Sequence, residues 1–252
     1  MIAVFVNCAA VILGSIFGLI FSKKFSSKME EVIQTGAGIV TLVHGLQMAF
    51  KFQNVIYFTL SIILGGILGT ALDIDGKILY LGKKIESLFY SKKSELNSLK
   101  ENDVNENSLE KKSFSYAFLN SSVLFCVGAM SILGSLKAGI EKDYSIIFTK
   151  SILDGFMAIS FTAAMGIGTA FSSIIILIYQ GGLTLLSTFL QPYCTEQMIT
   201  ELTGSGGALI CMIGINLIGL KKIKTANYLP SVLFTVIFVL LDPVIGKIGN
   251  LF

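Results

Sequence analysis

Residues 36–50 read GAGIVTLVHGLQMAF, and residues 206–220 read GGALICMIGINLIGL. Both stretches are apolar, rich in glycine and shorter than the ~20 residues that a helix needs to span a bilayer. A shift of 169 positions aligns three pairs of residues: Gly38 with Gly207, Gly45 with Gly214, and Gln47 with Asn216. Short, glycine-interrupted apolar segments at corresponding places in two halves of a chain indicate a transport site formed by inverted repeats.

The composition indicates an integral membrane protein. The chain has 252 residues, of which 53% are hydrophobic and 14% charged, and its mean hydropathy is +0.77. Continuous apolar runs of about 18 residues or more recur along the chain, which is typical of membrane-spanning helices. A membrane β-barrel would instead show alternation in segments of ~10 residues. The fold class that we expect is therefore all-α.

About eight transmembrane helices are expected, at residues 2–22, 32–50, 54–72, 114–136, 144–168, 171–190, 204–220 and 228–246. The division between the fifth and sixth rests on one glycine- and serine-containing stretch, GIGTAFSS at 166–173, so seven spans are the alternative. Each short span belongs to a unit of three helices, and five helices separate the start of the first unit from the start of the second. Because five is an odd number, the two units insert into the membrane in opposite directions. The pattern thus predicts two inverted three-helix repeats.

All 19 basic residues are lysines, and their distribution predicts an orientation. Three, eight and three of them lie in the connections that follow the first, third and seventh spans, against five elsewhere. Because lysine-rich connections face the cytoplasm, eight spans place both termini outside. Seven spans would put the last lysine group on the wrong side.

Four segments follow from this division of the chain. The first repeat covers 1–72, and 73–113 forms a cytoplasmic amphipathic helix (73–90) followed by a disordered polar linker (91–113). Two central helices occupy 114–170, and the second repeat covers 171–252. Each short span, 32–50 or 204–220, is expected to follow an amphipathic connector, at 26–34 and 195–203.

Several motifs together resemble those of a known family. They are VNCAAVILGSIFG (6–18), LFCVGAMSILGSLKAGI (124–140), TKSILDG (149–155), YQGGLTLLS (179–187) and GGALICMIGINLIGLKKIKTANYLPSV (206–232). In combination they resemble the bacterial membrane family called domain of unknown function 554 (YqgA/YdfK-like), over nearly the whole chain apart from 91–113. The resemblance implies a multi-pass protein of the bacterial inner membrane. It implies no substrate, reaction or assigned site.

Asp154 is the strongest candidate for chemistry, because it lies inside an apolar run. A carboxylate in a span costs several kcal/mol unless a partner or a polar cavity faces it. Lys150 precedes it by four residues and shares its helix face, so the two can pair. One interpretation is a proton or cation coupling site. The other is a pair near the outer interface, with Lys150 reaching toward water.

Polar and glycine residues of the short spans form the second candidate site. Gln47 and Asn216, at equivalent repeat positions, would converge on one ligand, or would form ordinary hydrogen bonds between helices. If the short helices begin inside the membrane, the glycines that open them would expose free N–H groups to an anion or a carbonyl, the alternative being close helix packing. These glycines are Gly36, Gly38, Gly204, Gly206 and Gly207. Asn7 and Gln180 are further candidate ligands, although isolated polar residues in spans more often make structural hydrogen bonds.

No catalytic, cofactor or metal site is expected. The chain has no Walker loop, no HExxH and no nucleotide fingerprint, and its four cysteines show neither CxxC nor Cys/His spacing. We therefore do not expect an enzyme or a nucleic-acid-binding protein.

These observations predict a small secondary transporter or channel in the lipid bilayer. Its small solute or ion would bind between the two short helices, and a homodimer would help to enclose the path. The alternative is a membrane scaffold or sensor that does not transport and acts through its cytoplasmic loop.

Overall fold

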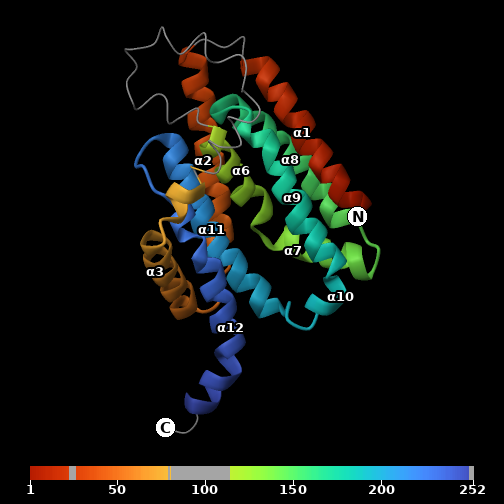
Figure 1. Ribbon diagram of the computed structural model, residues 1–252, viewed down its shortest axis with the longest axis vertical. Coiled ribbons are helices and arrows are strands. Elements are labelled where there is room, and N and C mark those ends of the chain that lie inside the picture. The colour runs from red at the N-terminus through yellow and green to blue at the C-terminus, as the bar shows by residue number, and fades with distance from the viewer. Residues whose placement is uncertain (23–26, 79, 81–113, 250–252) are drawn as a thin grey trace.

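The fold is a bundle of helices (Figure 1). The computed structural model describes residues 1–22, 27–78, 80 and 114–249. The described residues are 86% helical and contain no strand. Within this part of the chain, six helical segments are long and apolar enough to cross a membrane: Ile2–Ser22, Glu31–Ala49, Ser145–Met165, Gly168–Leu185, Glu196–Ile218 and Thr225–Asp242. The predicted membrane-type all-helical class is confirmed at this level.

Two parallel helices, α1 (Ile2–Ser22) and α8 (Ser145–Met165), pack backbone to backbone on one side of the bundle (Figure 1). A Cβ added at Gly14 would collide with the carbonyl of Gly155, and one added at Gly18 would lie 2.5 Å from the carbonyl of Ile159. Helices can approach this closely only through small residues. Asp143, which precedes α8 and lies outside the candidate spans, accepts hydrogen bonds from Ser145, and these hold the pKa of its carboxyl below its usual value.

The span predicted at 114–136 is broken, which corrects the expectation of one helix there. α6 (Phe114–Cys126) and α7 (Ala129–Ile140) meet at an angle of 62°. Gly128 has φ 134°, a conformation that favours glycine. Val127, beside it, lies against Gly206, where an added Cβ would collide with the valine side chain. The break thus rests on a neighbouring helix.

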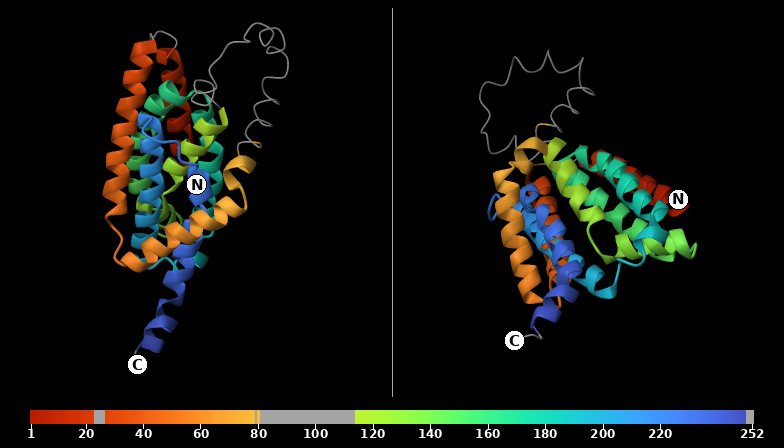
Figure 2. Two further views of the ribbon diagram at one scale, coloured as in Figure 1. Left: turned by 90° about the vertical axis from the view of Figure 1, so that its left-hand side faces the viewer. Right: turned by 60° about the horizontal axis from the view of Figure 1, so that its bottom comes forward.

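The two stretches predicted as short spans belong to long helices, α2 (Ser27–Ala49) and α11 (Glu196–Ile218). The expected separate connectors at 26–34 and 195–203 are therefore wrong, because each lies within or at the start of the same continuous helix. Thr195 caps α11 by accepting a hydrogen bond from the N–H of Met198 at 3.1 Å. α2 and α11 lie side by side and antiparallel (Figures 1 and 2).

A second antiparallel pair lies at the edge of the bundle (Figure 2). α3 (Val55–Ala71), shorter than the candidate spans, packs against α12 (Pro230–Gly249) and the 3-10 turn η2 (Thr225–Tyr228). Tyr57 donates a hydrogen bond from its hydroxyl to Asp242 across this pair.

The predicted break between the fifth and sixth spans is present. α8 ends at Met165, and α9 (Gly168–Leu185) begins after Gly166 and Ile167. The short α10 (Ser187–Leu190) follows α9. Most of the predicted amphipathic helix at 73–90, and all of the linker at 91–113, lie outside the described residues.

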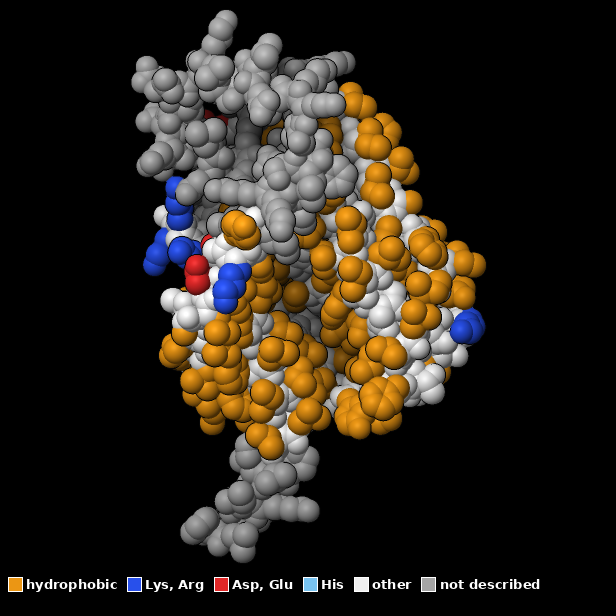
Figure 3. All heavy atoms as spheres, viewed as in Figure 1, with side chains coloured by type: hydrophobic (Ala, Val, Ile, Leu, Met, Phe, Trp, Pro, Cys, Tyr) orange, Lys and Arg blue, Asp and Glu red, His pale blue; other side chains and the backbone are white. Residues whose placement is uncertain are grey.

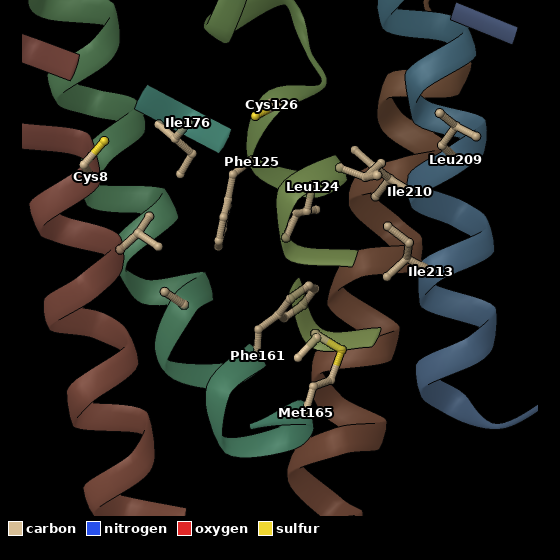
Figure 4. Packing of buried hydrophobic residues seen from close by; sticks show 14 of the residues in the cluster. Cys8, Leu124, Phe125, Cys126, Phe161, Met165, Ile176, Leu209, Ile210 and Ile213 are labelled. Atoms are coloured by element: carbon tan, nitrogen blue, oxygen red, sulfur yellow. The ribbon is translucent and has the colours of Figure 1, made fainter. Parts of the chain in front are cut away.

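The main core lies between these helix pairs (Figure 4). Phe125 and Leu124 of α6 lie between Cys8 and Ile176 on one side and Ile210 and Ile213 on the other. Outward, large apolar side chains are exposed, for example Phe17 at 52%, Val43 at 61% and Ile67 at 62%. Orange apolar side chains cover most of the described part of the face shown in Figure 3. A surface of this kind is suited to lipid.

Candidate functional site

A charged pair lies buried inside the bundle. Lys150 Nζ is 2.7 Å from Asp154 Oδ1 and 2.5 Å from Oδ2. Both residues are 6% exposed. The predicted pairing of Lys150 with Asp154 on one face of α8 is confirmed, and it takes place within the protein interior.

Two amides from other helices complete the surroundings of this pair. Asn7 of α1 donates from Nδ2 to Asp154 Oδ2 at 3.0 Å and to Gln180 Oε1 at 3.1 Å. Asn7 and Gln180 are both fully buried. The structure therefore brings together three residues that the sequence proposed separately, from α1, α8 and α9. We call Lys150, Asp154, Asn7 and Gln180 the polar cluster.

The polar cluster reaches the break between α6 and α7 through Ser131. Gln180 Nε2 lies 3.5 Å from Ser131 Oγ, and that hydroxyl donates to the carbonyl of Phe125 at 3.1 Å. The break between α6 and α7 interrupts the intrahelical hydrogen bonding near the carbonyl of Phe125. The Ser131 hydroxyl gives this carbonyl a hydrogen-bond donor instead. A chain of polar groups thus runs from α8 through α1 and α9 to an irregular piece of backbone.

The cluster has acceptor capacity that its internal bonds do not use. Asn7 Oδ1 is buried and has no hydrogen-bond partner. Buried polar atoms without partners are uncommon and call for an explanation such as a bound ion or water. A Cβ added at Gly155, the residue after Asp154, would lie 3.4 Å from the carbonyl oxygen of Ala10 in α1. The close α1–α8 packing holds Asn7 against the carboxylate.

Gln47 and Asn216, predicted to converge, do not meet. Gln47 is exposed on α2. Asn216 binds the loop after α11, donating to the carbonyl of Ile223 at 2.8 Å and accepting from its N–H at 2.7 Å. Gly207 lies against Ala49, and because α2 and α11 are antiparallel, Gln47 lies level with residue 209. That position is seven residues, or about 10 Å along α11, from Asn216. The prediction that the two amides face one ligand is wrong.

The glycines predicted to open the short helices lie instead within continuous helices, where their N–H groups belong to intrahelical bonding. That part of the prediction is wrong, because α2 begins at Ser27, nine residues before Gly36, and α11 begins at Glu196, eight residues before Gly204.

Counted along each helix, Gly36 is the tenth residue of α2 and Gly204 the ninth residue of α11. Gly38 and Gly207 serve the contact between α2 and α11, whereas Gly204 lies against Phe52 and Gly206 against Val127. A Cβ added at Gly38 would lie 2.9 Å from the backbone N of Ile218, and one added at Gly207 would collide with the backbone of Ala49. Gly36 differs, because nothing lies within 4 Å of its Cβ position. The alternative of close helix packing therefore describes most of these glycines.

Sequence reasoning missed Ser131 as a member of the site. The signal was present, because Ser131 follows Gly128 in the quoted FCVGAMS motif, and a glycine inside a span can mark a break. The angle of that break and the contact with α9 are tertiary features. They are absent from any local pattern.

Comparison with known proteins agrees with the membrane-type fold. A family model described as "Protein of unknown function (DUF554)" matches residues 2–240. The chain is 28% identical over 240 residues to "Uncharacterized membrane protein YdfK" of Bacillus subtilis (strain 168), covering 93% of this chain and 94% of that protein. It is 27% identical over 230 residues to "Uncharacterized protein YqgA" of Escherichia coli (strain K12), covering 91% and 92%. No solved structure matches the chain.

Proposed function

The chain belongs to the DUF554 family, and we propose that it is a small secondary transporter or channel of the bacterial inner membrane. Its ion or solute site is the polar cluster, and Asp154 is the coupling group. The observation that carries the proposal is the buried Lys150–Asp154 pair with Asn7 and Gln180 around it. This site replaces the one predicted between α2 and α11.

The energetics of burial support a functional reason for the pair. Moving two charges out of water costs several kcal/mol per ion, and an apolar pair of similar volume is often equally stable or more stable. Ionisable residues within membrane spans are accordingly rare and mark ion or substrate pathways. Apolar side chains of similar volume could hold α1, α8 and α9 together without this cost.

Asp154 can exchange partners within the cluster. Its carboxylate is held by Lys150 and by Asn7. A proton or a metal cation on the carboxylate would weaken the attraction to Lys150, while the unpartnered Oδ1 of Asn7 offers a further oxygen ligand to a cation. Ion binding at Asp154 would thus change the contacts between α8, α1 and α9, which is the coupling that a transporter requires.

Two inverted repeats and eight spans remain part of the proposal. The contact of Gly38 with Ile218 and the contact of Gly207 with Ala49 are related by the same shift of 169 positions that aligns the two sequence stretches. The contacts of Gly45 with Cys211 and of Gly214 with Leu42 are related in the same way. This reciprocal pattern in the α2–α11 pair is what a two-fold axis between the repeats would produce, and it supports them.

Orientation and assembly complete the proposal. Counting the bent α6–α7 pair and the short α3 as spans gives eight, and the lysine distribution then places both termini outside the cytoplasm. A homodimer remains a prediction from the small number of helices in one chain.

The test is charge movement in reconstituted protein, which needs no knowledge of the solute. Proteoliposomes on a solid-supported membrane are exposed to rapid steps of H⁺, Na⁺ or K⁺. We expect a transient charge displacement with at least one cation, lost in Asp154→Asn and retained in Gln47→Ala, whose side chain is exposed. If the unmodified protein gives no displacement with any of the three cations, or if Asp154→Asn behaves like it, the scaffold or sensor alternative replaces the proposal.

A further inference from the structure

A cavity of about 520 Å³ lies between the ends of α3 and α11 and is separate from the polar cluster. Its lining includes Lys221, Lys222 and Lys224 from the connector between α11 and η2. This connector is the KKIK segment (221–224) of the sequence motif, and none of its residues belongs to the polar cluster. Ligand cavities in proteins commonly have volumes of ~300–1,000 Å³.

The backbone that carries these lysines is held in a fixed shape. Gly219 ends α11 in a left-handed conformation with φ 84°, and its N–H bonds to the carbonyl of Asn216 at 3.1 Å. The N–H of Leu220 bonds to the carbonyl of Ile215 at 3.2 Å. The Asn216 side chain then binds both backbone groups of Ile223. The lysines therefore project from an organised connector.

The opposite wall of the cavity is tied to the connector as well. Asn227 of η2 is 4% exposed, and its Oδ1 accepts a hydrogen bond from the N–H of Asp75 at 2.9 Å. A Cβ added at Gly69 would collide with the backbone carbonyl of Asn227. The end of α3 and the turn η2 thus form one rigid frame around the cavity.

The charge balance of the lining favours an anion. The lining holds three lysines and one acid, Asp73, and the neighbouring Asp75 interacts electrostatically with Lys224. The Asp73 carboxylate is directed toward Gly76, where it would collide with an added Cβ, so it is turned to the start of the segment after α3. Thr70 supplies a hydroxyl, while Met212, Ile223 and Tyr228 make the rest of the wall largely apolar.

A basic, partly apolar cavity at the end of membrane helices has the chemistry of a site for a phosphate group with an apolar attachment. We propose that the cavity lined by Lys221, Lys222 and Lys224 binds a phosphate-bearing anion, the headgroup of an anionic phospholipid or a soluble phosphate. The lysines supply the charge, and the Met212 and Tyr228 side chains provide apolar surface for the attached group. In Figure 3 blue lysine side chains, with red acidic side chains among them, gather on one shoulder of the molecule above the orange apolar surface. Basic pockets between membrane helices on the cytoplasmic side bind acidic headgroups in this way.

The experiment compares two triple variants of the full-length protein. Lys221→Gln/Lys222→Gln/Lys224→Gln removes the cavity charge, and Lys51→Gln/Lys137→Gln/Lys142→Gln removes the same charge from three lysines outside the cavity. Native mass spectrometry in detergent measures binding of phosphatidylglycerol and of phosphatidylcholine. Thermal unfolding in detergent measures stabilisation by inorganic phosphate and pyrophosphate.

We expect the cavity variant to bind phosphatidylglycerol at least about tenfold more weakly than the unmodified protein, since it lacks three lysines that attract the acidic headgroup. The control variant should keep its affinity, and phosphatidylcholine should not distinguish the proteins. Stabilisation by phosphate or pyrophosphate that is lost only in the cavity variant supports a soluble phosphate as the ligand. Equal binding of every anion by both variants, or an equal loss in both, overturns the proposal.

Discussion

The α2–α11 contact and the polar cluster are two interiors of opposite kind. In the first, glycines let two backbones touch, and Gly45, Gly207 and Gly214 leave no room for any ligand between the helices. In the second, charged and amide side chains from α1, α8 and α9 are enclosed together. Glycine-rich stretches in a membrane chain therefore identify where helices meet. The Lys150–Asp154 pair identifies where the helices enclose charge, which membrane spans rarely do.

The largest effect should come from breaking the charged pair. Asp154→Leu leaves Lys150 buried without its partner, and we expect a loss of about 3–5 kcal/mol in the free energy of unfolding. The double variant Lys150→Met/Asp154→Leu removes both charges and should stay within about 1 kcal/mol of the unmodified protein while losing charge displacement. Denaturant titration in mixed micelles measures both. A double variant as unstable as the single one would show that the pair is needed for packing.

The next largest effect should come from filling the α2–α11 contact. Gly207→Ala places a methyl group against the Ala49 backbone, and we expect a loss of about 1–3 kcal/mol. Gly36→Ala is the matched control, because its Cβ position is open and alanine is the better helix former. That change should be neutral or stabilising by up to about 1 kcal/mol. Equal effects of the two variants would contradict the close packing.

A smaller loss is expected from Asn216→Ala. The change removes side-chain bonds to Ile223 and leaves its backbone groups without their partner, which should destabilise the protein by about 1–2 kcal/mol. Because the connector then loses its fixed shape, cleavage after Lys221 and Lys222 by trypsin should become faster. Unchanged cleavage would show that Gly219 alone holds the connector.

The smallest effect separates two glutamines of the same chemical type. Gln47→Ala changes an exposed side chain and should alter the free energy of unfolding by no more than about 0.5 kcal/mol. Gln180→Ala leaves Asn7 with fewer partners in a buried site, so a loss of about 1–3 kcal/mol is expected. The same denaturant titration compares them. A larger loss for Gln47→Ala than for Gln180→Ala would contradict the exposed position of Gln47 on α2.

Much of this architecture follows from the sequence, and the exceptions have physical causes. Hydropathy predicts the helices, and the i, i+4 spacing predicts the Lys150–Asp154 pair, because both depend on local geometry. The lengths of α2 and α11 were underestimated, since polar residues such as Glu201 end an apolar run without ending a helix. Glu201 is 1% exposed and accepts hydrogen bonds from the N–H groups of Gln53 and Asn54.

The grouping of Asn7, Asp154 and Gln180 needs three helices to be placed in space. No spacing in the sequence encodes that. The same limit explains the failed convergence of Gln47 and Asn216, which equivalent repeat positions suggested. In an antiparallel pair, equivalent positions lie on opposite sides of the crossing point unless they are at the centre.

The placement of both charges on one helix bears on how the chain enters the membrane during synthesis. Lys150 and Asp154 lie one turn apart on α8, so their attraction is available as soon as that helix forms, before α1 or α9 is in place. The segment can thus leave the insertion machinery as an electrically neutral unit, avoiding the penalty that an isolated charge incurs in lipid. Asn7 and Gln180 then join a pair that already exists.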